Sequence, residues 1–164
     1  MKSVGFIGGG NMGLALGQAF ARRFPEIELF VCDLRPERVA RFRESLPAAR
    51  VTAEPASLAA RAEVVFLAVK PQDVAPVLEA IRATDRLVVS IAAGVPLARL
   101  ERALPGARVV RVMPNTPCLV GAMAAGYACG GRATAEDRRT VEALLGAAGY
   151  AAELREGSWT RSRV

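Results

Sequence analysis

Short apolar runs alternate along the chain with segments that mix apolar and polar residues. The apolar runs predict β-strands over residues 4–8, 27–32, 50–52, 63–69, 86–91, 107–113, 124–129 and 150–154. The segments between them predict helices over residues 14–24, 36–46, 56–62, 71–83, 96–103 and 135–147, with Thr134 as the N-cap of the last. A continuous apolar run, such as the one that ends at Val69, is typical of a strand buried on both faces. This alternation predicts an α/β fold with a doubly wound, mostly parallel sheet.

Composition indicates one domain. The chain has 164 residues, 52% hydrophobic and 5% aromatic, so small aliphatic side chains should dominate the core. No apolar run is long enough to span a bilayer, and the first residues lack a signal-peptide pattern. The cysteines, Cys32, Cys118 and Cys129, form no paired framework, and we expect reduced thiols in the cytoplasm. We place the domain at residues 1–154 and assign residues 155–164 to a tail.

The charge pattern limits the partners that we expect. The net charge is +6 and is carried almost wholly by arginine, which is compatible with nucleic acid, an anionic cofactor or a biased composition. The arginines are scattered through the predicted helices and are not interleaved with aromatic residues, so we expect a solvated basic surface and neither a nucleic-acid nor a membrane partner. The sequence has no histidine, which excludes an imidazole base or ligand, and we predict no metal site.

The first strand leads into a glycine-rich stretch, "VGFIGGGNMG" at residues 4–13. Gly8 would allow a tight turn, Gly10 would let a pyrophosphate approach the backbone, and Gly13 would let the following helix pack on the strand. Asn11 and Met12 lie within this stretch, where the helix N-terminus offers free N–H groups to phosphates. A glycine-rich turn without a ligand is the alternative, but the flanking strand and helix favour a Rossmann-type dinucleotide site.

An acidic residue is expected about twenty positions further on, at the tip of the second strand, and Asp33 fills that place. Its carboxylate would accept from the ribose hydroxyls of NADH and repel the 2′-phosphate of NADPH. Arg35 could instead pair with that phosphate, or be a solvated charge at a helix start. The sequence therefore predicts NADPH or NADH as the cofactor and leaves the choice open.

Two later segments also follow predicted strands. "FLAVKPQ" at residues 66–72 places Lys70 where the carboxyl ends of parallel strands form a ligand crevice. "RVMPNTP" at residues 111–117 holds the backbone between two prolines and presents Asn115 and Thr116 toward the same crevice. Pro-Asn-Thr-Pro is also a sound turn sequence, so a purely structural role is the alternative.

Together, these segments resemble the N-terminal domain of pyrroline-5-carboxylate reductase. The matching pieces are "FIGGGNMGLAL", "FLAVKPQ", "SIAAGV" at residues 90–95 and "RVMPNTP", in the order of that family, and the resemblance runs from residue 2 to about residue 154. It implies hydride transfer from NADPH or NADH to the C=N carbon of 1-pyrroline-5-carboxylate, which gives L-proline. This chemistry mainly requires the two reactants to be oriented and water to be excluded.

The resemblance also assigns residues. The cofactor site would comprise Gly8, Gly10, Asn11, Met12, Gly13, Asp33, Arg35, Ala68, Val69, Lys70 and Pro71. The border of nicotinamide and substrate would comprise Met113, Pro114, Asn115 and Thr116. No side chain of this chain is assigned as the catalytic residue. The family's helical second domain dimerises, so a homo-oligomer is expected for the full-length form.

Three features depart from the family. The run after the second proline is "LVGAMAAG", and Glu54 and Pro55 stand where an asparagine is common. The end, "EGSWTRSRV", is polar and aperiodic and differs from the helical domain that follows in the family. We hypothesise a frameshifted reading of a longer gene, because a shifted reading of synonymous codons gives Leu-Leu-Asp-Ala-Val-Thr-Gly; truncation is the alternative. The chain alone should bind dinucleotide weakly and reduce the imine poorly or not at all.

Other functions stay open at this point. The chain could be a non-catalytic dinucleotide-binding or regulatory module, which activity with the imine would distinguish. It could also be another Rossmann oxidoreductase, such as a deazaflavin-dependent reductase or a hydroxyacid dehydrogenase, although "AVKPQ" and "MPNTP" argue against this.

Overall fold

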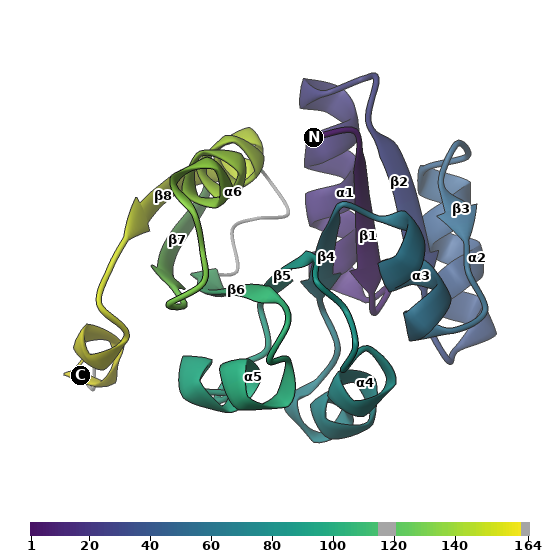
Figure 1. The fold of residues 1–164 in the computed structure, drawn as a ribbon. Helices are drawn as coiled ribbons and strands as arrows, with labels where there is room; N and C mark the ends of the chain where they lie inside the picture. Colours follow the sequence, from purple (N-terminus) through teal and green to yellow (C-terminus); the bar gives the residue numbers. More distant parts are fainter. Residues whose placement is uncertain (115–120, 162–164) are drawn as a thin grey trace.

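An eight-stranded sheet forms the centre of the computed structural model, which describes residues 1–114 and 121–161 (Figure 1). The strand order is β3-β2-β1-β4-β5-β6-β7-β8. The strands are β1 (Ser3–Ile7), β2 (Glu28–Cys32), β3 (Arg50–Val51), β4 (Val64–Leu67), β5 (Leu87–Ser90), β6 (Arg108–Pro114), β7 (Met123–Cys129) and β8 (Gly149–Glu153). The α-helices are α1 (Asn11–Arg23), α2 (Pro36–Ser45), α3 (Pro55–Arg61), α4 (Val74–Ala80), α5 (Leu97–Ala103) and α6 (Ala135–Ala148). The 3-10 helices include η1 (Pro71–Asp73) and η3 (Glu156–Arg161).

The sheet is mostly parallel, as predicted. Strands β1 to β6 pair in parallel, β7 pairs antiparallel with β6, and β8 pairs in parallel with β7. A parallel pairing needs a crossover of about a dozen residues or more. Only residues 115–122 separate β6 from β7, which is too short for that crossover, whereas α6 supplies one between β7 and β8.

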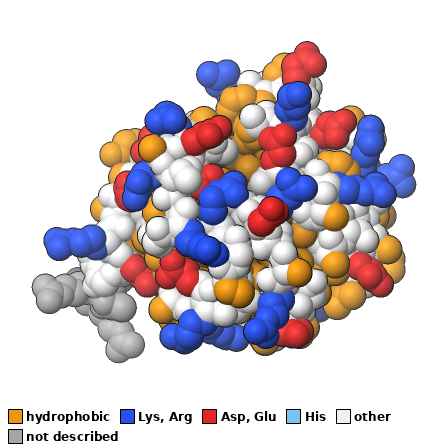
Figure 2. Space-filling model, in the orientation of Figure 1, with side chains coloured by type: hydrophobic (Ala, Val, Ile, Leu, Met, Phe, Trp, Pro, Cys, Tyr) orange, Lys and Arg blue, Asp and Glu red, His pale blue; other side chains and the backbone are white. Residues whose placement is uncertain are grey.

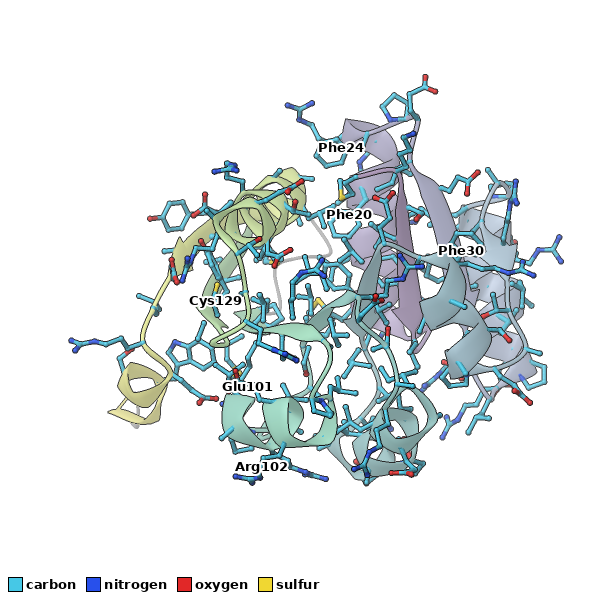
Figure 3. The ribbon with its side chains drawn as sticks, in the orientation of Figure 1. Phe20, Phe24, Phe30, Glu101, Arg102 and Cys129 are labelled. Carbon is cyan, nitrogen blue, oxygen red and sulfur yellow. The ribbon has the colours of Figure 1, made fainter. Side chains whose placement is uncertain are left out.

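Helices cover both faces of the sheet, which makes the fold doubly wound (Figure 1). Helices α1, α2 and α6 contribute buried side chains to one hydrophobic cluster, and α3, α4 and α5 contribute to the other. The first cluster contains an aromatic group centred on Phe6 of β1, whose ring centroid lies 5.8 Å from Phe20, 5.8 Å from Phe42 and 5.3 Å from Phe66. Phe20, labelled in Figure 3, comes from α1, so this group anchors the helix that follows the glycine-rich stretch.

Most predicted boundaries agree with the structure to within a few residues. Helix α1 begins at Asn11 rather than at residue 14, because its first three residues belong to the glycine-rich stretch, where the glycines hide the helical pattern. The helix predicted over residues 71–83 is divided into η1 and α4 and ends at Ala80. Pro76 is the third residue of α4, where an N–H has no partner within the helix, so the proline fits a helix that begins at Val74 better than one continuous from residue 71.

Thr134 caps α6 as predicted. Its side chain accepts a hydrogen bond from the N–H of Asp137 at 3.1 Å, and the Asp137 carboxylate accepts one from the Thr134 N–H at 2.9 Å. This reciprocal capping box satisfies two backbone donors at the start of the helix.

The segment after β8, which was expected to be polar and aperiodic, forms η3 and packs against the domain. The Leu154 N–H donates to the Tyr127 carbonyl at 2.8 Å. The Trp159 ring lies 5.0 Å from the guanidinium carbon of Arg111 on β6. The described part of this segment is therefore in contact with the sheet.

Within residues 1–114 and 121–161, no helix is both long and apolar enough to cross a membrane. Figure 2 shows basic side chains, Lys and Arg together, scattered over the visible face among acidic and apolar ones, as the sequence predicts.

Candidate functional site

The glycine-rich stretch makes a tight turn between β1 and α1. Gly8 has a φ of +106°, and a Cβ at this position would lie 2.5 Å from the carbonyl oxygen of Ala68, just after β4. A Cβ on Gly13 would lie 2.6 Å from the carbonyl oxygen of Gly8. A side chain fits at neither position without displacing backbone, so Gly8 has its predicted role and Gly13 allows α1 to approach the turn.

Gly10 is different, because its surroundings are open. A Cβ at this position would have a single heavy-atom neighbour within reach, Nη1 of Arg38 at 4.0 Å. Gly10 is the N-cap of α1, and the first helical hydrogen bond runs from the Leu14 N–H to the Gly10 carbonyl at 2.9 Å. The N–H groups of residues 11–13 therefore point out of the helix end, where an anion is favoured.

The predicted segments meet around one cavity of about 400 Å³. It is lined by Gly10, Asn11, Met12, Arg38, Ala68, Val69, Lys70, Pro71, Ile91, Ala92, Ala93, Met113 and Pro114. These residues follow the carboxyl ends of β1, β4 and β5, or end β6, apart from Arg38 on α2. The strand order reverses between β1 and β4, and ligands of open α/β sheets bind at this switch point.

Two predicted site residues, Asn115 and Thr116, lie outside the described residues. The rim that precedes them is described: Met113 is 38% exposed and lines the cavity together with Pro114. Lys70 is exposed and lines the cavity together with Pro71.

Asp33 is directed into the protein. Its Oδ2 accepts a hydrogen bond from the Gly9 N–H at 2.8 Å, and its Oδ1 accepts one from the Arg35 N–H at 2.8 Å. The side chain of Asp33 is 7% exposed, and Nη1 of Arg38 lies 3.7 Å from Oδ2. The carboxylate thus ties the turn after β2 to the turn after β1, and its contact with the ribose hydroxyls stays a prediction. The side chain of Arg35 is exposed, and Arg35 does not line the cavity.

Four lining residues were not predicted. Ile91, Ala92 and Ala93 belong to "SIAAGV", and their position directly after a predicted strand was the signal that could have identified them. Arg38 is the third residue of α2 and belongs to no motif. Its place in the site depends on how α2 is rotated against the turn.

The site offers little acid–base chemistry. Arg38 and Lys70 are the charged residues among those that line the cavity in the described part of the chain. The neighbouring thiol of Cys32 is buried, and burial raises its pKa, so it stays protonated and is a poor nucleophile. No group of three or more potential metal ligands occurs among the residues that the structure describes. The cavity can therefore bind and orient an anionic ligand.

Fold and cavity together define a dinucleotide-binding domain of the Rossmann class, with an open helix N-terminus at the switch point of the sheet. Residues 3–94 match the family described as NADP oxidoreductase, coenzyme F420-dependent, and the chain belongs to this family. The chain is also similar to pyrroline-5-carboxylate reductases. It is 42% identical to the enzyme from Haemophilus influenzae over 154 residues, which cover 90% of this chain and 56% of that enzyme.

Solved structures give the same result. The pyrroline-5-carboxylate reductase from Coxiella burnetii superposes with a TM-score of 0.87 and 29% identity, over 93% of this chain and 58% of that one. The enzyme from Plasmodium falciparum, solved with NADP bound, gives a TM-score of 0.84 and 27% identity, over 96% of this chain and 59% of that one. The chain thus spans somewhat more than half the length of these relatives.

Proposed function

We propose that the chain is the cofactor-binding domain of a pyrroline-5-carboxylate reductase. The whole protein would transfer a hydride from NADPH or NADH to the C=N carbon of 1-pyrroline-5-carboxylate and produce L-proline. The main support is that four segments far apart in the sequence line one cavity at the switch point: Gly10–Met12, Ala68–Pro71, Ile91–Ala93 and Met113–Pro114. These are the segments through which the chain resembles the reductases.

The residues fit a dinucleotide. The N–H groups at the start of α1 would hold the pyrophosphate, because a Cβ is absent at Gly10 and nothing crowds the backbone there. Ala68–Pro71 would lie along the nicotinamide riboside, and Met113–Pro114 would border the ring and the substrate. The small side chains of Ala68, Ala92 and Ala93 leave room for a flat ring against the strand ends.

Reduced nicotinamide, when bound, supplies the hydride. The chain's part is to hold the acceptor carbon and the ring together and to exclude water. A protonated imine is already electrophilic, so a lining with two cationic side chains and no histidine is sufficient. The substrate would be a small molecule, and we propose a homo-oligomer for the full-length form and the cytoplasm as its location.

The test separates binding from turnover. Titration with NADPH and with NADH, followed by calorimetry, should show binding by this chain. A fusion to the C-terminal part of the Haemophilus influenzae relative should oxidise the cofactor faster when the imine is present, whereas the chain alone should do so poorly or not at all. A fusion that binds cofactor but does not respond to the imine would contradict the reductase function and leave a dinucleotide-binding module.

A further inference from the structure

The contacts of Asp33 change the expected basis of cofactor choice. An acidic residue at the tip of the second strand usually accepts from the ribose hydroxyls and thereby favours NADH. Here both carboxylate oxygens already accept backbone hydrogen bonds, from Gly9 and from Arg35, each at 2.8 Å. With 7% of its side chain exposed, Asp33 has little surface left for a ribose.

The charge of Asp33 is also compensated. Nη1 of Arg38 lies 3.7 Å from its Oδ2, which is an ion-pair distance but longer than a hydrogen bond. The positive charge of Arg38 therefore weakens the repulsion that the Asp33 carboxylate would otherwise exert on a nearby phosphate.

Arg38 is placed to contact an anion itself. Its side chain is 30% exposed, and its Nη1 lies 4.0 Å from the position of a Cβ on Gly10, so the guanidinium lies beside the open part of the turn. Arg38 lines the cavity, whereas Arg35 does not. A guanidinium has five N–H donors and can bind a phosphate through two of them at once.

A second arginine on the same face of α2 adds to this charge. Arg41 follows Arg38 by three residues, so both side chains leave the helix on one side. Nη1 of Arg41 donates to Oδ1 of Asn11 at 2.7 Å, which fixes this cation against the first residue of α1. Arg38 and Arg41 together thus outweigh the single negative charge of Asp33 beside the start of α1.

We infer that Arg38 is the residue that determines cofactor preference, by binding the 2′-phosphate of NADPH, while Asp33 serves to shape the turn. The inference rests on the proposed cofactor-binding function and assigns the preference that the sequence left open. The sequence position suggested Arg35 for this role. We assign the role to Arg38 instead, because the packing of α2 brings Arg38 to the cavity.

The test measures binding and needs no turnover. The folded chain is titrated with NADPH and NADH, and with 2′-AMP and 5′-AMP as fragments that carry the phosphate at one position or the other. The wild type should prefer NADPH. Arg38→Ala should weaken NADPH binding about ten- to a hundred-fold, as expected for the loss of a hydrogen-bonded charge, and change NADH binding by less than about threefold. Binding of 2′-AMP should fall and that of 5′-AMP should not.

Matched variants make the result specific. Arg43→Ala removes an exposed arginine from the same helix and should leave both affinities unchanged. Arg38→Lys should recover part of the preference, and Arg38→Gln keeps a long polar side chain near Asp33 in case the alanine variant does not fold. Equal weakening of NADPH and NADH in the Arg38 variants, or loss of preference in Arg35→Ala alone, would overturn the inference. If the wild type bound neither cofactor, the proposed function would fail together with the inference. If the wild type bound both cofactors but the Arg38 variants kept its preference, only the inference would fail.

Discussion

Glu156 and Arg111 form an ion pair that joins the segment after β8 to the strand below the cavity rim. The side chain of Arg111 is 11% exposed and that of Glu156 is 29% exposed, so this pair is largely removed from solvent. The same Glu156 oxygen accepts from the Leu97 N–H at 2.8 Å, at the start of α5. One carboxylate therefore connects three segments. Its partner Arg111 lies on β6, two residues before Met113.

Replacing Glu156 by alanine should destabilise the chain by about 3 kcal/mol, because it leaves the charge of Arg111 nearly buried and unpaired. Urea unfolding followed by the fluorescence of Trp159, the single tryptophan, would measure this. Trp159 packs on Arg111, so its native emission should also shift. Glu79→Ala is the control: Glu79 pairs with Arg82 at an exposed site, and its loss should not change the unfolding free energy measurably. Equal effects of the two variants would show that the Glu156 contact is not structural.

The glycines of the turn should respond differently to alanine. Gly8→Ala combines a φ of +106° with a Cβ only 2.5 Å from a carbonyl oxygen, so we expect a loss of about 2–5 kcal/mol. Gly10→Ala should leave the fold nearly unchanged but place a methyl group where the pyrophosphate would approach, and so weaken cofactor binding. Gly146→Ala, in an open position of α6, is the control and should stabilise by about 0.5–1 kcal/mol. Melting curves with and without NADPH separate these outcomes. Unchanged NADPH binding by Gly10→Ala would contradict the placement of the pyrophosphate.

Asp33→Asn tests the structural role of this carboxylate. An amide can accept from one of the two backbone N–H groups but presents donors to the other, so we expect a loss of about 1–3 kcal/mol in the unfolding free energy. Asp85→Asn makes the same chemical change at a side chain that is 90% exposed and should have little effect. If Asp33→Asn unfolds like the wild type, the carboxylate does not hold the two turns together.

The sequence predicts the sheet and the location of the site because both depend on local signals. Short apolar runs, prolines at helix starts and the Thr134 cap define the elements, and the rule that ligands bind at strand ends brings the "AVKPQ" and "MPNTP" segments together. The contacts that change the interpretation are long-range. Gly9 and Asp33 are 24 residues apart, and Arg111 and Glu156 are 45 residues apart. Neither pair has a local pattern, because each depends on how the elements pack, as does the rotation of α2 that brings Arg38 to the cavity.

Stability should fall at alkaline pH because of Cys129, which lies at the end of β7 (Figure 3). Burial, together with the nearby Glu153 carboxylate, raises the pKa of this thiol from 9.0 to about 11. Between these values the unfolded chain releases the proton while the folded chain keeps it, so the folded state is favoured below about pH 9 and loses this advantage as the pH rises toward 11. Buried Cys32 and Tyr127 have raised pKa values as well and add to the same trend. Unfolding free energies measured from about pH 8 to about pH 11 in reducing buffer should therefore decline, and Cys129→Ser should show a shallower decline. An identical slope in that variant would mean that the thiol titrates alike in both states.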